Sequence, residues 1–221
     1  MALADQTDGI DWRADVPVSV AHGDPFYSLS DGAAESLYVF LAGNDLPARL
    51  RDGFHIAELG FGTGLNLALV LAAWAGPGRI RYTSFEAAPL ARDVIARALS
   101  AFPAVTTTGW VPAAVLDAPD LRLSLPHAEI RVITGDARDA LPAWDGTADA
   151  WFLDGFSPAR NPAMWEPALM AEVARHTGPG GTFATYTAAG AVRRALSAAG
   201  FEVERCAGFG RKRHMTRGVL R

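Results

Sequence analysis

A short apolar segment, residues 55–59, leads directly into a glycine-rich turn, residues 60–64, and then into an apolar helix expected over about residues 65–75. This strand–turn–helix unit constrains the fold most, because a parallel strand pair needs a crossover helix between its members. Further strands are expected over residues 79–86, 129–137, 148–155 and within 178–187, and helices over about residues 89–101 and 188–199. The alternation predicts an α/β fold with a doubly wound, mostly parallel sheet.

The two ends of the chain differ from this pattern. Residues 201–206 and 215–221 predict a hairpin around the loop 207–214, which adds an antiparallel strand to the sheet. We expect residues 1–50 to form an N-terminal extension that packs on a domain of residues 51–221, so that the chain makes one structural domain.

Two internal stretches are less regular. Asn161 followed by Pro162 predicts the cap and first position of a helix. Residues 102–128 carry four prolines and are expected to lack regular structure. These prolines are Pro103, Pro112, Pro119 and Pro126.

Composition excludes several classes of protein. The chain has 221 residues, 50% of them hydrophobic and 20% charged, as in a globular domain of ordinary size. No apolar run approaches the roughly 20 residues that a membrane helix needs. The single cysteine, Cys206, and five scattered histidines offer no metal-ligand spacing. We expect a cytoplasmic protein with no metal and no membrane segment.

Four acidic residues follow the ends of predicted strands: Glu58, Glu86, Asp136 and Asp154. In an open parallel sheet, ligands bind beyond the carboxyl ends of the strands. Carboxylates gathered there repel one another unless a ligand offers hydroxyls, amines or positive charge. The ligand of this edge is therefore expected to carry such groups.

The turn after the first strand of the unit reads Gly60-Phe61-Gly62-Thr63-Gly64. A dinucleotide fingerprint needs one more residue before its third glycine, and Leu65 occupies that place. Glu58 just before the turn disfavours a pyrophosphate and favours a cation. S-adenosylmethionine offers a sulfonium, an α-amino group and ribose hydroxyls, so it is the expected cofactor.

In this interpretation Glu86 meets the ribose hydroxyls and Asp136 the adenine amino group, while Asn66 contacts the methionine moiety or merely caps a helix. The alternative for the turn as a whole is a purely structural role. The predicted cofactor-binding residues are Glu58, Gly60, Phe61, Gly62, Gly64, Asn66, Glu86, Asp136 and Asp154.

Four blocks make a resemblance specific: YSLSDGAAESLYVFLAGNDL (27–46), ELGFGTGLN (58–66), DAWFLDGFSPARNPAMW (149–165) and GFGRKRHM (208–215). With them the chain resembles the tRNA 5-methylaminomethyl-2-thiouridine methyltransferase family, the methyltransferase half of MnmC, in a stand-alone form. The resemblance implies a class I S-adenosylmethionine-dependent methyltransferase with a Rossmann-like fold. It also implies N-methylation of the aminomethyl group on the wobble uridine of tRNA, which gives 5-methylaminomethyl-(2-thio)uridine.

One departure from the family concerns its second activity. In many bacteria this domain is fused to a flavin-dependent oxidoreductase that prepares the amine. The chain has no second glycine-rich nucleotide motif, so we expect no fused flavin oxidoreductase domain here and expect other enzymes to make the amine. The alternative is that the sequence is a piece of a longer protein.

Asp154 is the expected catalytic residue. An amine attacks a methyl group only in its neutral form, which at pH 7 is about one part in a thousand for a pKa near 10. We expect Asp154 to orient the amine by a hydrogen bond, while water or the carboxylate takes its proton. Phe26, Phe156 and Trp165 are expected to lower the amine pKa by excluding water. The alternative for Asp154 is a helix cap or an Asx turn.

The remaining substrate candidates lie in the matching blocks. Asp31, Glu35 and Asn44 either close over the donor or cap a helix and a turn. Ser157 and Arg160 follow Asp154 closely, and Arg160 is a candidate contact for a phosphate.

The hairpin loop is basic. Residues 190–221 hold eight basic and two acidic residues, although the whole chain has 20 basic and 24 acidic ones. If the first hairpin strand runs parallel to the sheet, Arg211, Lys212 and Arg213 flank the ligand edge and meet tRNA phosphates. The alternative is a solvated basic face.

Two other functions remain open. The first is N-methylation of a small free amine, which requires a closed pocket without a basic rim. The second is a non-catalytic tRNA- or nucleotide-binding module in which the four acids only cap turns. A nicotinamide dehydrogenase is disfavoured by Leu65.

Overall fold

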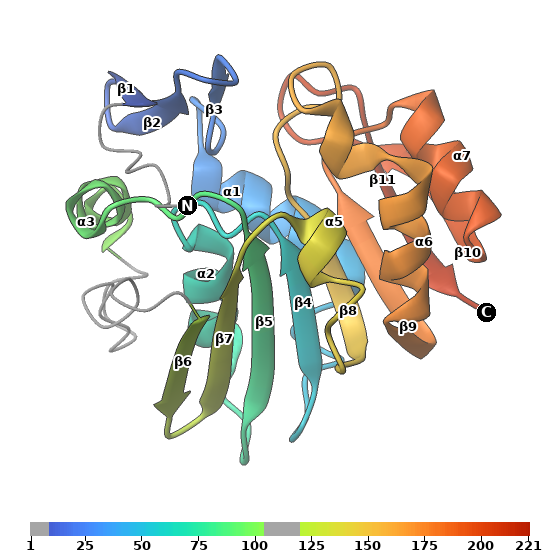
Figure 1. Ribbon diagram of the computed structural model, residues 1–221. Coiled ribbons are helices and arrows are strands. Elements are labelled where there is room, and N and C mark those ends of the chain that lie inside the picture. The colour runs from blue at the N-terminus through green and yellow to red at the C-terminus, as the bar shows by residue number, and fades with distance from the viewer. Residues whose placement is uncertain (1–8, 104–119) are drawn as a thin grey trace.

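The computed structural model describes residues 9–103 and 120–221. Its main sheet has the strand order β10-β11-β9-β8-β4-β5-β7-β6 (Figure 1). The strands are β4 (His55–Leu59), β5 (Ile80–Glu86), β6 (Asp120–Leu125), β7 (Ala128–Thr134), β8 (Ala148–Leu153), β9 (Thr177–Thr185), β10 (Phe201–Ala207) and β11 (His214–Leu220).

The central strands are parallel. β4 pairs in parallel with both β5 and β8, and the sheet continues in parallel through β7 on one side and β9 on the other. The strand order therefore reverses at β4, where an open sheet of this kind binds its ligands. The helices between the strands are α2 (Leu65–Ala73), α3 (Arg92–Ser100), α5 (Ala137–Ala140), α6 (Pro167–Arg175) and α7 (Gly190–Ala198). The doubly wound fold is thus confirmed.

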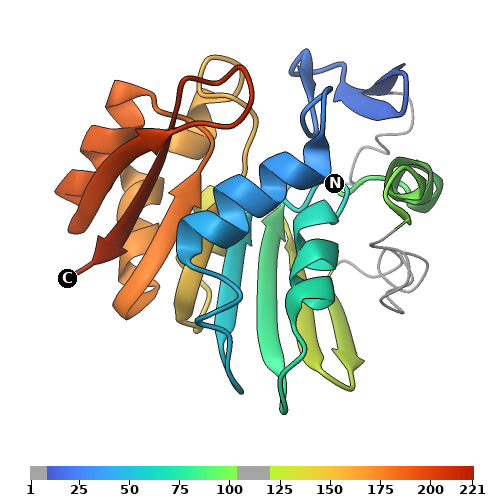
Figure 2. The ribbon, with the colours of Figure 1, turned by 180° about the vertical axis from the view of Figure 1, so that it is seen from behind.

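The C-terminal hairpin is confirmed as well. β11 pairs antiparallel with both β9 and β10, so β10 runs parallel to β9. The loop that joins the hairpin strands consequently lies at the carboxyl edge of the parallel strands, together with the turn after β4 (Figure 2).

Two local predictions are wrong. β6 lies in the stretch expected to be irregular and pairs antiparallel with β7 at the edge of the sheet; Pro112 and Pro119 of that stretch lie outside the described residues. The segment after Asn161 makes only a short 3₁₀ turn, η5 (Pro162–Trp165), and α6 starts at Pro167. Proline keeps the residue before it extended, so Glu166, with ψ of 146°, interrupts any continuous helix.

The N-terminal segment forms a small sheet beyond the carboxyl ends of the main strands and a helical run across one face of the main sheet. A small antiparallel sheet of β1 (Ile10–Arg13), β2 (Val16–Ser19) and β3 (Asp24–Pro25) precedes a helical run. That run comprises α1 (Gly32–Ser36), the π-helical turn η2 (Leu37–Leu41) and η3 (Ala42–Asn44). With α2 it covers the face seen in Figure 2, whereas α6 and α7 cover the face seen in Figure 1. The division of the chain at residue 50 remains a prediction.

Apolar packing holds these layers together. On the face of the helical run, Phe40 packs against Phe152 of β8 with ring centroids 5.5 Å apart. On the other face, Trp151 stacks on Phe85 and is fully buried. Successive residues of β8 thus fill opposite cores, which is why this strand reads as a continuous apolar run.

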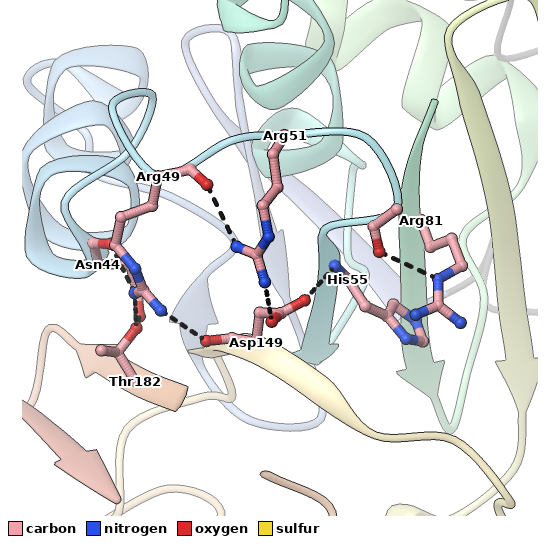
Figure 3. Close-up of polar contacts among 8 residues, drawn as sticks. Asn44, Arg49, Arg51, His55, Arg81, Asp149 and Thr182 are labelled. Carbon is pink, nitrogen blue, oxygen red and sulfur yellow. Dashed lines mark hydrogen bonds and ion pairs between the residues drawn. The ribbon is translucent and has the colours of Figure 1, made fainter. Parts of the chain in front are cut away.

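At the amino ends of the strands, a polar cluster ties the segment before β4 to β8 (Figure 3). One carboxylate oxygen of Asp149 accepts a hydrogen bond of 2.8 Å from the backbone N–H of His55, and the other pairs with Arg51 at 2.8 Å. Arg49 donates to the backbone carbonyls of Asn44 and Asp149, at 3.0 and 3.1 Å. The cluster fixes where the chain enters the central strand.

We predict that Asp149→Ala lowers the free energy of unfolding by about 1–3 kcal/mol, because the His55 N–H loses its acceptor. Urea unfolding measures this loss, and cofactor affinity should stay unchanged because the cluster lies at the opposite edge from the acids. Asp145→Ala, an exposed carboxylate of the preceding loop, is the control. Equal stabilities of the two variants would contradict the assigned role.

Candidate active site

A cavity of about 720 Å³ opens at the carboxyl ends of the parallel strands. Its walls come from the turns after β4, β5, β7, β8 and β9, from residues 22–36 and from the hairpin loop. The sequence-predicted residues that line it are Phe26, Glu35, Gly60, Phe61, Gly62, Asn66, Glu86, Asp136, Asp154, Phe156, Ser157, Arg211 and Lys212. Those outside the lining are Asp31, Asn44, Glu58, Gly64, Arg160, Trp165 and Arg213.

The turn after β4 requires glycine at its first position. Gly60 has φ of +90°, and a Cβ there would lie 2.5 Å from the carbonyl oxygen of Asp154. Any side chain would therefore separate the ends of β4 and β8. Because the two strand ends touch, the ligand edge presents backbone of the glycine turn next to the Asp154 carboxylate.

Glu86, at the end of β5, orders the same turn. Its carboxylate accepts hydrogen bonds of 2.9 Å from the backbone N–H groups of Gly62 and Ala88. A carboxylate has about four acceptor positions, so capacity remains for ligand hydroxyls on the cavity side.

Asp136 has a partner that sequence reasoning did not include. It caps the short helix α5, and its side chain pairs with Arg138 at 2.6 Å. Hydrogen bonds from the Arg138 side chain lower the pKa of Asp136. A ligand amino group that reaches Asp136 must share this carboxylate with the guanidinium.

The centre of the site is a hydrogen-bonded chain of four polar side chains. The amide nitrogen of Asn66 donates to Glu58 at 2.9 Å and to Asp154 at 2.7 Å, and Ser84 donates to the other oxygen of Glu58 at 2.8 Å. Glu58 is only 1% exposed and lies beneath Asn66, outside the cavity. In this structure Glu58 contacts Asn66 and not the cavity, and its contact with the ligand stays a prediction.

Burial raises the pKa values of both carboxyl groups in this hydrogen-bonded chain. Burial and then the charge of Asp154 raise the pKa of Glu58 to about 8. Burial also raises the pKa of Asp154 to about 7. The Oδ1 atom of Asn66 is buried and has no hydrogen-bond partner among the described residues, although the side chain lines the cavity.

On the far side of Asp154, the end of β9 supplies Tyr186, which sequence reasoning missed. Its hydroxyl donates to the carbonyl of Gly155 at 2.7 Å. The Lys212 ammonium lies 4.2 Å from the centre of its ring and 2.8 Å from a carboxylate oxygen of Glu35. Lys212 was expected to face phosphates, but it points inward because Glu35 is there to pair with it. The carboxyl-end rule that selected Asp154 could also have selected Tyr186.

The N-terminal segment closes this half of the cavity. His22 stacks on Phe156 at 4.5 Å, and Phe26 contacts the same ring edge-on at 5.1 Å. The Asp24 carboxylate accepts a hydrogen bond of 2.9 Å from the backbone N–H of Ser157. His22 and Asp24 were also missed, since no sequence pattern links them to residues so far along the chain.

Three substrate candidates make structural contacts outside the cavity lining, and their contacts with the substrate stay predictions. Asn44 is fully buried and bonds the Phe40 carbonyl and Thr182 at 2.9 and 2.6 Å, away from the cavity. Trp165 donates to the Phe156 carbonyl at 2.8 Å and supports that loop from behind. Asp31 caps α1 by accepting from the Ala34 N–H at 2.9 Å.

Comparison with known proteins identifies the family. A family model described as an S-adenosyl-L-methionine-dependent methyltransferase matches residues 107–221. The chain belongs to this family. S-adenosylmethionine is thus the cofactor of the methyltransferase, as the sequence predicted.

Its relatives agree with the resemblance found in the sequence. The methyltransferase is 48% identical, over 94% of its chain, to the tRNA 5-methylaminomethyl-2-thiouridine biosynthesis bifunctional protein MnmC of Caulobacter sp. strain K31, and 44% identical over 96% to that of Chromohalobacter salexigens. It covers 37% and 33% of those proteins, about a third of their length. The crystal structure of MnmC2 from Aquifex aeolicus matches 96% of this chain and 70% of its own, with 26% identity and a TM-score of 0.76.

Every helix in residues 9–103 and 120–221 is too short or too polar to span a bilayer. The same residues contain no group of three His, Cys, Asp or Glu side chains arranged to hold a metal ion.

We predict that stability falls as pH rises from about 4 to about 8. In unfolded chains Asp and Glu have pKa values near 4, so in this window the folded state, with its raised pKa values at Glu58 and Asp154, binds more protons. The free energy of unfolding then falls by at most about 1.4 kcal/mol per pH unit for each such group. Asp154→Asn should flatten this decline in urea unfolding measured across the range.

The matched control is Asp139→Asn, which removes an exposed carboxylate from α5. It should reproduce the pH profile of the unaltered protein. If Asp154→Asn also reproduces that profile, the raised pKa of Asp154 is refuted.

Proposed function

We propose that this chain N-methylates the aminomethyl group on the wobble uridine of tRNA, giving 5-methylaminomethyl-(2-thio)uridine. One observation carries the proposal: Asp154, with a pKa near neutrality, lies at the centre of an acid-lined cavity between the glycine turn and Tyr186. A cavity of this charge favours a cationic cofactor and an amine substrate. The similarity to the MnmC proteins supports the choice of amine.

The residues on the glycine-turn side suit S-adenosylmethionine. Glu86 and Asp136 present acceptors to hydroxyl and amino groups, and Asn66 lines the same part of the cavity. Gly60 and Gly62 let a ligand approach the backbone closely. When bound, the cofactor supplies an activated methyl group.

The chemistry of the chain's own residues centres on the proton of the amine. A primary amine arrives mostly as an ammonium ion and must lose one proton before attack. With a pKa of about 7, Asp154 can accept that proton far more readily than an ordinary carboxylate. Phe26 and Phe156 exclude water around it, which favours the neutral amine. Asn66 holds the Asp154 carboxylate in place by a hydrogen bond. The remaining rate enhancement comes from orienting the amine toward the methyl group.

The rim of the cavity suits an anionic polymer. Arg211 lines the opening, Arg213 is exposed on the same hairpin loop, and Arg160 is exposed on the loop after β8. We propose that these guanidinium groups contact phosphates around the wobble base and that the enzyme meets its tRNA in the cytoplasm. Because the relatives are named as bifunctional proteins about three times longer, we propose that a separate domain or enzyme makes the amine.

The test is to incubate the protein with labelled S-adenosylmethionine and tRNA that carries the unmethylated aminomethyl uridine, then digest the tRNA and identify the labelled nucleoside. We expect label in methylaminomethyl uridine, and none with tRNA whose wobble uridine is unmodified. Label transferred only to small free amines would instead favour N-methylation of a free amine. A protein that does not bind the cofactor would refute both methyltransferase functions.

Asp154→Ala is the companion variant in this assay. Loss of the base and of the orienting hydrogen bond should reduce the rate by at least about a hundredfold, the lower range for general base catalysis. A rate within tenfold of the unaltered protein would exclude a catalytic role for Asp154.

We also predict that reversing charge at Arg211 and Arg213 to glutamate weakens tRNA binding and reduces its salt dependence, because phosphate contacts release counterions. Filter binding at several salt concentrations measures both, and calorimetry should show unchanged affinity for S-adenosylmethionine. Arg205→Glu, on the outer strand β10, controls for net charge. Equal tRNA affinities of all three variants would place the RNA elsewhere.

A further inference from the structure

The sheet order divides the cavity at Asp154. On one side lie the ends of β4, β5 and β7, with the glycine turn, Glu86 and Asp136. On the other side lie the end of β9, with Tyr186, and the hairpin loop. The first half carries the groups that suit the methyl donor, so the second half is left for the group that receives the methyl.

Acids surround Tyr186 in this second half. After burial, the charges of Asp154, Asp24 and Glu35 raise the pKa of the Tyr186 hydroxyl. Asp24 and Glu35 come from the N-terminal segment and Asp154 from the end of β8, and the side chain of Glu35 is only 9% exposed. A region with this excess of negative charge, beside the face of an aromatic ring, favours an organic cation.

Such a cation is already present in the chain itself. The Lys212 ammonium lies 2.8 Å from Glu35 and 4.2 Å from the ring centre of Tyr186. The Lys212 side chain is 45% exposed, so its ammonium enters from the solvent side on a flexible stem. Gly210, with φ of +58° and open space around it, gives the loop freedom to carry this stem outward.

The end of a lysine side chain and an aminomethyl uridine share one chemical group, a methylene bearing a primary ammonium. We propose that Glu35 and the Tyr186 ring form the receptor for the substrate ammonium, and that Lys212 occupies this receptor until the substrate displaces it. The inference rests on the proposed function, since it names the subsite in which the amine is received.

The consequence is that only a positively charged substrate displaces Lys212 from Glu35. A neutral nucleoside cannot replace the ammonium of Lys212 at Glu35 without leaving a buried carboxylate unpaired, which is costly. A substrate ammonium can, and the released Lys212 then lies free at the rim beside Arg211. Received next to Asp154, the substrate ammonium can pass its proton to that carboxylate and become the neutral amine.

The test uses nucleosides without phosphates, so that contacts of Lys212 with RNA do not enter. 5-Aminomethyluridine is the charged probe and 5-methyluridine its uncharged counterpart, each titrated into the protein and followed by NMR. Lys212→Met removes the ammonium and keeps the stem. We expect it to bind 5-aminomethyluridine about three- to tenfold more tightly, because the internal competitor is gone, and 5-methyluridine as before.

Two further variants complete the design. Glu35→Gln should abolish the preference for the charged nucleoside, and Arg205→Met, which removes a positive charge from β10, should change neither affinity. Calorimetry with S-adenosylmethionine verifies that every variant is folded. Weaker or unchanged binding of 5-aminomethyluridine by Lys212→Met overturns the proposal, as does equal binding of the two nucleosides by the unaltered protein.

The readout is separate from methyl transfer. A protein that prefers the charged nucleoside but does not methylate tRNA supports the receptor and overturns the proposed function alone. A protein that methylates tRNA but shows no such preference overturns the receptor alone.

Discussion

The amide nitrogen of Asn66 donates to two carboxylates at once, and the rest of the site depends on this shared donor. Glu58 and Asp154 end neighbouring strands, where burial and mutual repulsion would otherwise disfavour both charges. Asn66 relieves that cost only in part, so the pKa values stay raised, at about 8 and about 7. Gly60 must lack a side chain because the end of β8 packs directly against the glycine turn. This close packing brings Asp154 within hydrogen-bond distance of Asn66.

The cavity combines this acidic centre with charges from both ends of the chain. Asp24 and Glu35 come from the N-terminal segment, and Lys212 comes from the C-terminal hairpin. Each of the two expected ligands, a sulfonium cofactor and an amine, is cationic on arrival, so one negative field attracts both. The substrate must nevertheless react as a neutral amine. A carboxylate whose pKa lies near the working pH meets both requirements, since it attracts the cation and can then accept its proton.

The sequence predicted the parts of the molecule that depend on local pattern. Buried parallel strands are continuous apolar runs, and acids directly after them identify the ligand edge, so Glu86 and Asp154 could be placed without a structure. The sequence did not reveal contacts between side chains that are far apart along the chain. Asn44 binds Thr182, and Lys212 turns inward toward Glu35; neither partner is visible from its own neighbourhood. The prediction of a helix from Asn161 was wrong for a local reason: Pro167 keeps Glu166 extended, so α6 starts only at Pro167.

The predictable and the unpredictable residues lie in different halves of the cavity. The donor half is built from successive strand–turn–helix units, each of which places its ligand groups within a few residues of a strand end. The acceptor half is assembled from β9, from residues 22–36 and from the hairpin loop, which are far apart in the sequence and meet only through the tertiary fold. The ion pair between Glu35 and Lys212 joins the first and last of them across the opening. A ligand that breaks this pair therefore removes one of the contacts between the N-terminal segment and the hairpin, which Tyr38 also joins by donating to the carbonyl of Ala207 at 3.2 Å.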